Sequence, residues 1–294
     1  MRSYPMTLLL LFVSFFALAN DTTKVAQQQE AESNIKYITE PSITYQNYIK
    51  INVPKGFKLL DRESANYVSE EIFQNQPDKD LLGLLLKMDE EENIIYSVYI
   101  SENKEGYIED KDASKIDKNE ILKEQQKSEK EFYKQNPDIP VKLYFTGWGM
   151  DPEYDQPNHT LHFAKVFREG SSDESVLNYQ LYKLNKYGYV NITVAADTAL
   201  LGMIREDIPV LYDMVAYENQ SGYGDFDPST GSYAQWTVGG LVAGKILAKT
   251  GILALILKNI KLVLIGIGAA FYAIVRFFKR KKKDEIIVEN PENN

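Results

Sequence analysis

Two short segments of the sequence gather oxygen-bearing side chains of the kind that bind hard cations. One is Asp225-Phe226-Asp227-Pro228-Ser229-Thr230-Gly231, and the other is Glu109-Asp110-Lys111-Asp112. Calcium prefers such carboxylate and hydroxyl oxygens, but neither segment has the glycine at position six or the final glutamate of an EF-hand loop. A turn, or a cap ahead of the next helix, explains each segment more simply. A divalent cation is a candidate ligand, and we expect no other cofactor.

Acidic and aromatic residues in the expected turns form a candidate binding surface. If its carboxylates converged in one pocket, they could act as general acid and base, with or without a metal ion. If they lie on separate turns, the same residues favour recognition of a partner. The candidate binding residues are Tyr107, Asp110, Asp112, Trp148, Tyr154, Asp155, Asn178, Asp225 and Asp227.

Several familiar catalytic and metal-binding patterns are excluded. His159 and His162 are the only histidines, and a spacing of three in a strand turns them to opposite faces, so they cannot chelate one metal. Residues 239–245 fit the G-x-x-x-x-G-K part of a phosphate-binding loop, but Ile246 stands where Ser or Thr is required. The chain has no Cys, which excludes a thiol nucleophile and disulfides.

The elements that must position these residues are mostly strands. Alternating apolar and β-branched runs predict strands over residues 45–53, 81–88, 94–101, 141–147, 160–168, 176–184 and 189–195. Helical patterns cover residues 64–73, 118–135 and 198–217; the second buries a narrow stripe through Ile121, Leu122, Phe132 and Tyr133. Hairpin-length connections favour an α+β fold, a largely antiparallel sheet with helices packed on it. We expect one compact unit; the alternative is two small lobes hinged near residues 136–140.

The two ends of the chain predict export and anchoring. Residues 1–19 have the pattern of a signal peptide, and residues 20–34 that of a flexible leader. We expect an extracytoplasmic domain over 35–220, a linker and interfacial helix over 221–250, a transmembrane helix over 251–278 and a basic cytoplasmic tail over 279–294. Lys258 and Lys261 lie inside the span at a cost of about 2.5–3.5 kcal/mol each, so a helical hairpin is the alternative. We favour a single pass, because a hairpin would place the basic tail on the exported side.

The net charge of the chain and a stripe of small residues indicate which partners it can bind. Between residues 20 and 235 the chain has 38 acidic and 22 basic residues, so the exported part carries a net charge of −16. Such a surface repels phosphate backbones, and we expect no nucleic acid to bind. Gly240, Gly244 and Ala248 form a stripe through which the chain could associate with itself or with a partner helix; a flexible approach to the membrane explains them equally.

Five segments in order resemble a bacterial family of uncharacterised membrane-anchored proteins, which is defined by a domain of unknown function. They are the turn at residues 53–57, the segment 106–113, Gly147-Trp148 with residues 152–155, Asn178-Tyr179 with Gly188, and residues 223–230 before the Gly/Ala/Lys-rich anchor. The resemblance covers nearly all of the chain after the signal peptide. It implies a signal peptide, an extracytoplasmic domain and a C-terminal anchor, and it carries over no catalytic residue.

These observations favour a non-enzymatic protein of the cytoplasmic membrane with its domain on the periplasmic side. We expect a binding or structural module, and its partners are the membrane and an envelope protein or a second copy of the chain. The alternative is an envelope hydrolase that uses the carboxylates named above, with or without a divalent ion.

Overall fold

The structure is a computed structural model of the chain, and it describes residues 35–72, 75, 77–91, 93–137, 142–170 and 175–243. The expected signal peptide, leader, transmembrane helix and basic tail, together with Gly244 and Ala248, lie outside these residues. From Tyr37 onward the described residues belong to one compact unit.

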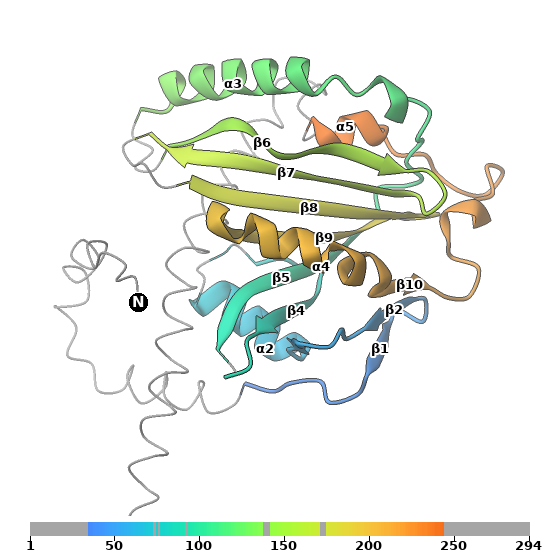
Figure 1. Ribbon diagram of the computed structural model, residues 1–294. Coiled ribbons are helices and arrows are strands. Elements are labelled where there is room, and N and C mark those ends of the chain that lie inside the picture. Colours follow the sequence, from blue (N-terminus) through green and yellow to red (C-terminus); the bar gives the residue numbers. More distant parts are fainter. Residues whose placement is uncertain are drawn as a thin grey trace, which may run out of the picture. The chain divides into compact units, whose positions relative to one another are not determined.

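In the part of the chain that the structure describes, ten strands form two antiparallel sheets. The larger sheet has the order β3-β4-β5-β9-β8-β7-β6, and the smaller has the order β1-β2-β10 (Figure 1). The strands are β1 (Ser42–Tyr45), β2 (Ile49–Asn52), β3 (Phe57–Leu59), β4 (Leu81–Met88), β5 (Ile94–Asn103), β6 (Leu143–Asp155), β7 (Thr160–Glu169), β8 (Ser175–Asn185), β9 (Gly188–Asp197) and β10 (Val215–Tyr217).

Helices cover both faces of the larger sheet (Figure 1). The α-helices are α2 (Arg62–Tyr67), α3 (Lys118–Gln135), α4 (Leu201–Asp213) and α5 (Val238–Val242). A π-helical turn, Val68–Ile72, continues α2, and short 3-10 turns lie at Ala113–Lys115, Thr198–Leu200 and Tyr223–Asp225. The predicted α+β class with an antiparallel sheet is therefore confirmed. Among the described residues, no helix has both the length and the apolar character needed to cross a bilayer.

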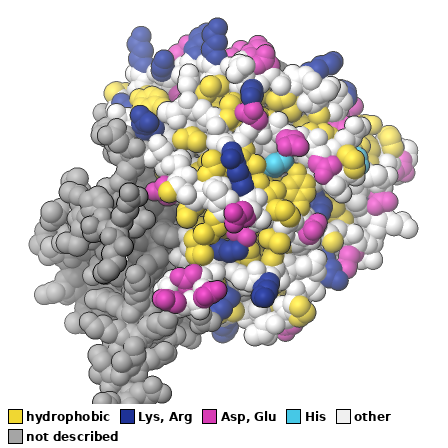
Figure 2. Space-filling view, viewed as in Figure 1, with side chains coloured by type: hydrophobic (Ala, Val, Ile, Leu, Met, Phe, Trp, Pro, Cys, Tyr) yellow, Lys and Arg dark blue, Asp and Glu magenta, His cyan; other side chains and the backbone are white. Residues whose placement is uncertain are grey.

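Strand β7 shows how the sheet separates two cores. Ala164 and Val166 face α4 and the small sheet, whereas Leu161 and Phe163 face α5 and the segments around residues 108 and 223. This alternation is the period-two pattern that predicted the strand. On the α4 side, apolar side chains at the surface lie among charges of both signs (Figure 2).

The predicted bounds of three elements are wrong, because strand pairing with other parts of the chain determines where each element begins or ends. The strand expected over residues 45–53 is a hairpin, because Gln46 and Asn47 have φ of 52° and 66° and reverse the chain between β1 and β2. The helix expected over 198–217 ends at Asp213, since residues 215–217 pair with β2. The strand expected over 141–147 continues to Asp155 as β6, an edge strand whose three bulges accommodate Pro152.

The ordered domain also extends past the expected boundary at residue 220. Tyr223, Val238, Leu241 and Val242 are buried in the core on the α5 face of the sheet. A linker would have left these side chains exposed. The first part of the predicted linker is thus a packed part of the domain, because its apolar residues cover the sheet face opposite α4, beside α3.

A glycine at the β8–β9 turn provides a test of the fold. Gly188 has φ of 151°, and an added Cβ would lie 2.0 Å from the carbonyl oxygen of Asn103. We expect Gly188→Ala to lower the free energy of unfolding by about 1–3 kcal/mol or more. Gly202 in α4 has nothing within 4 Å of its added Cβ, so Gly202→Ala should leave stability unchanged or raise it. Thermal unfolding followed by circular dichroism gives the melting temperatures of the two variants. Equal melting temperatures would contradict the close approach described at Gly188.

Candidate functional site

One end of the larger sheet collects most of the turns that carry the predicted site residues. The end of β5, the β6–β7 turn, the β8–β9 turn and the segment from residue 222 to residue 233 all lie there, at the right in Figure 1. Antiparallel pairing brings these turns together, because each strand ends at the same end of the sheet at which its neighbour begins. We therefore call residues 104–110, 154–159, 185–188 and 222–233 the sheet-end site.

Tyr107 is the centre of a stack of aromatic rings at this site. Its ring lies 4.4 Å from Tyr223 and 4.0 Å from Phe226, nearly parallel to both, and Tyr233 meets it edge-on at 5.9 Å. The backbone aligns the two segments, since Tyr107 N–H donates to Ser232 O at 2.8 Å and Ala234 N–H donates to Tyr107 O at 2.9 Å. The stack joins two segments more than a hundred residues apart in the sequence and leaves Tyr233 51% exposed.

Beside the stack, a carboxylate, a phenol and an imidazole form a hydrogen-bonded group. Tyr154 OH donates to Asp110 Oδ2 at 2.8 Å and lies 3.3 Å from His159 Nδ1. The His159 ring packs on Tyr223 at 4.2 Å. Burial, and then the hydrogen bond to Asp110, raise the pKa of Tyr154, so the phenol stays protonated near neutral pH and acts as a donor. The hydrogen bonds of this group can fix the conformation of the sheet-end site or bind a polar ligand. The group supplies no activated nucleophile.

A groove of about 380 Å³ opens next to the stack. Its walls are the start of the 104–110 segment, the β8–β9 turn and the loop from residue 225 to residue 232. The lining residues are Lys104, Gly106, Lys186, Tyr187, Asp225, Phe226, Asp227, Thr230, Gly231 and Ser232. It offers an aromatic surface, ammonium groups, carboxylates and hydroxyl groups together.

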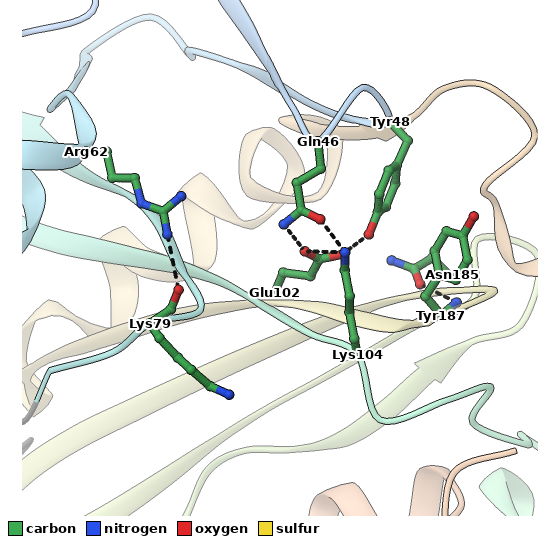
Figure 3. Close-up of polar contacts among 8 residues, drawn as sticks. All are labelled: Gln46, Tyr48, Arg62, Lys79, Glu102, Lys104, Asn185 and Tyr187. Atoms are coloured by element: carbon green, nitrogen blue, oxygen red, sulfur yellow. Dashed lines mark hydrogen bonds and ion pairs between the residues drawn. The ribbon is translucent and has the colours of Figure 1, made fainter. Parts of the chain in front are cut away.

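A buried carboxylate holds one rim of this groove in place. Glu102 is 4% exposed; it accepts hydrogen bonds from Gln46 Nε2 at 2.5 Å and from Tyr48 OH, and Lys104 Nζ lies 3.7 Å from its Oε2 (Figure 3). Tyr48 in turn packs on Tyr187 with ring centres 5.2 Å apart. The β1–β2 hairpin is thus tied to the β8–β9 turn through the end of β5.

The remaining predicted carboxylates lie on separate turns, where each makes local hydrogen bonds. Asp155 accepts from Asn158 Nδ2 at 2.7 Å, Asp225 from Gly222 N–H at 2.9 Å and Asp227 from Ser229 N–H at 2.8 Å. Asp112 accepts from Gly239 N–H at 3.2 Å and from Thr237 Oγ1. In the described parts of the chain, no three His, Asp or Glu side chains are placed to hold a metal ion. The convergence that the hydrolase alternative requires is therefore not observed.

Two other predicted residues lie away from the sheet-end site. Trp148 Nε1 donates to Lys118 O at 3.1 Å, and the indole packs edge-on against Phe145 at 4.9 Å, inside the domain. Asn178 Oδ1 accepts from Gln180 Nε2 at 2.5 Å on β8. Of the nine predicted residues, the structure brings six to one end of the sheet and leaves Asp112, Trp148 and Asn178 elsewhere; the six are Tyr107, Asp110, Tyr154, Asp155, Asp225 and Asp227.

Sequence reasoning missed a buried ionic network under α3. Lys165 of β7 donates to Gln125 Oε1 at 2.9 Å and to Val242 O at 3.0 Å. Glu129 accepts from Gln125 Nε2 and from Phe145 N–H, both at 2.9 Å. Neither helix residue belongs to the apolar stripe that the sequence predicts to be buried, since both are polar members of a highly charged helix. A lysine among the apolar residues of β7 was the available signal, since a buried ammonium needs partners.

Aromatic rings and burial determine the protonation of the Lys165 ammonium group. Lys165 Nζ lies 5.3 Å, 5.6 Å and 5.5 Å from the ring centres of Phe145, Trp148 and Phe163. Burial lowers the pKa of Lys165 to about 8, and the carboxylate of Glu129 opposes that shift. The side chain is therefore mostly protonated at neutral pH, where cation–π contacts and hydrogen bonds offset its desolvation.

The lowered pKa of Lys165 predicts a dependence of stability on pH. Between about 8 and the ordinary value of 10.5, the unfolded chain keeps the proton that the folded chain releases, so this lysine makes stability rise with pH. Several buried tyrosines have raised pKa values and oppose this trend above pH 10. We expect Lys165→Met to reduce the rise between pH 8 and 10, of which Lys183 retains a part because burial lowers its pKa too, and Lys130→Met, on the exposed side of α3, to keep the full rise. Melting temperatures over that range test this; equal pH slopes in the two variants would refute it.

Comparison with known proteins gives a family and no activity. No curated protein matches the sequence. The solution structure of PsbP (CyanoP) from Synechocystis sp. PCC 6803 is similar at 7% sequence identity, over 63% of this chain and 92% of that one, with a TM-score of 0.33, too low to support a conclusion. The family described as "Protein of unknown function (DUF2167)" matches residues 39–272. Because that match takes in both sheets, the sheet-end site and the Lys165 network, the chain belongs to this family of unknown function.

Proposed function

We propose that this chain is a membrane-anchored protein of the cell envelope, and that its domain binds another envelope protein through the sheet-end site. The observation that carries the proposal is the placement of exposed apolar side chains. Among the described residues, four large hydrophobic side chains are exposed: Tyr187, Met203, Val210 and Tyr233. Tyr187 lines the sheet-end groove, and Tyr233 packs on Phe226, which also lines it.

The chemistry of the groove supports recognition. Tyrosine has a large contact area and few rotatable bonds, and tyrosines are enriched where proteins meet. Lys104 and Lys186 bring ammonium groups to the same groove, and Thr230 and Ser232 add polar groups that can fix the orientation of a partner. The groove wall is held by the Glu102 hydrogen bonds, so a partner would meet a surface that is already formed.

The state of the titratable groups argues for binding over hydrolysis. Burial raises the pKa of both Tyr154 and Tyr223, which keeps these phenols protonated. The carboxylates of Asp225 and Asp227 are used in hydrogen bonds within their own turns. The two phenols are therefore placed to donate hydrogen bonds, the two carboxylates accept them within their turns, and all four groups shape a surface.

Site-specific photo-crosslinking tests the contact surface. A photoreactive amino acid is placed in the full-length chain at Tyr187 or Tyr233, with Met203 and Val210 of α4 as matched controls of similar exposure. Irradiation of the native membranes should give one discrete protein adduct from positions 187 and 233 and none from positions 203 and 210. Adducts of equal yield from all four positions, or from α4 alone, would contradict the proposal.

The absence of Cys allows a direct test of membrane topology. Tyr233→Cys and Asn294→Cys each create a chain with one thiol. A membrane-impermeant maleimide applied to intact spheroplasts should label the Tyr233→Cys chain and spare the Asn294→Cys chain until the cells are lysed. Labelling of both chains before lysis would establish a hairpin, and labelling of neither would place the domain in the cytoplasm.

A further inference from the structure

A second groove, of about 410 Å³, lies between α3 and α5, on the sheet face opposite α4. One wall is the first half of α3 with the turn before it, and the other is formed by residues 235–237 and α5. Its volume falls in the range of about 300–1,000 Å³ that is usual for ligand pockets. The proposed contact surface at the sheet end shares no lining residue with it.

The floor of this α3–α5 groove is apolar. Ile116, Ile121, Trp236 and Ala243 line it, together with the backbone of Gly239 and Gly240. Ile121 and Trp236 also pack against the buried core of this face, so the floor is continuous with the interior. An apolar side chain placed here would be removed from water on most sides, which favours an occupant with an apolar stripe.

The rim of the groove is acidic. Among the described residues that line it are four carboxylates, against one ammonium group, that of Lys115; the carboxylates belong to Asp112, Asp117, Glu120 and Glu124. Asp112 and Asp117 cap α5 and α3, whereas Glu120 and Glu124 are exposed and four residues apart on one face of α3. A cationic occupant with charges one helical turn apart would match these two carboxylates, and an anionic one would be repelled.

The wall formed by α5 is held at both ends. Asp112 accepts from Gly239 N–H at the start of α5, and Lys165 donates to Val242 O at its end. An added Cβ on Gly239 would lie 2.6 Å from Asp112 Oδ2, and one on Gly240 would lie 2.8 Å from Trp236 Cβ. The backbone of α5 thus packs closely against the side chains of Asp112 and Trp236, so this wall is already formed and needs little rearrangement to accept an occupant.

We propose that the α3–α5 groove binds a cationic amphipathic segment of a partner protein. Apolar side chains of that segment occupy the floor at Ile121 and Trp236, and its Lys or Arg residues pair with Glu120 and Glu124. This second site is independent of the sheet-end site, so one domain would contact two chemically different partners or two parts of one partner.

Fluorescence of Trp236 provides the measurement. The full-length protein in detergent micelles is titrated with a short amphipathic peptide of Lys, Leu and Ala, and with a matched peptide in which Glu replaces Lys. We expect the Lys peptide alone to shift the emission, and the shift to disappear in Trp236→Phe. The double variant Glu120→Lys/Glu124→Lys should weaken binding about tenfold or more. The double variant Glu63→Lys/Glu131→Lys, with the same change in net charge away from the groove, should retain it.

Three outcomes would overturn the proposal. They are equal binding of the two peptides, equal weakening in the two double variants, and no binding at all. A fourth concerns the chain itself, because residues 244–250 contain Lys245 and Lys249 beside Ile246 and Leu247. If Lys245→Glu/Lys249→Glu tightened peptide binding, the groove would belong to the chain's own segment and the partner assignment would be wrong.

Discussion

The ammonium group of Lys165 lies between the larger sheet and the layer that covers it, and the arrangement of that layer depends on its partners. A charge removed from water is tolerated only with hydrogen bonds and a favourable electrostatic surrounding. Here α3 supplies Gln125 and Glu129, α5 supplies the carbonyl of Val242, and three aromatic rings lie close to the charge. These contacts fix where α3 and α5 lie on the sheet, and thereby create the groove between them.

At the end of the sheet, the buried carboxylate of Glu102 likewise holds neighbouring elements in place. Glu102 on β5 binds Gln46 and Tyr48 of the β1–β2 hairpin, and Lys104 joins the same group (Figure 3). The small sheet is therefore fastened to the large one by polar contacts, in addition to the apolar core beneath α4. Both grooves are bordered by elements that a buried ion holds in place, which is how rigid recognition surfaces are commonly supported.

The two surfaces differ in chemistry. The sheet-end site presents aromatic rings and ammonium groups, and its carboxylates are occupied by their own turns. The α3–α5 groove presents an apolar floor under exposed carboxylates on a domain that is acidic as a whole. Selectivity between partners would follow from this contrast, because lysines and aspartates are balanced in the sheet-end groove, whereas carboxylates are in excess in the α3–α5 groove.

Local pattern was enough to predict much of the fold and part of the site. The sequence predicted α3 and β4 at their observed bounds and β5, β7, β8 and β9 to within two residues at each end, because period-two and helical patterns reflect burial on one face. The sequence also predicted Tyr107, Asp110 and Tyr154 as site residues, and all three lie in the sheet-end site. Only the tertiary structure decided that residues 45–52 turn back as a hairpin, that residues 215–217 pair with β2, and that Lys165, Gln125 and Glu129 are buried together. These features depend on contacts between residues far apart in the chain, and a pattern read along one segment contains no information about the partner that will face it.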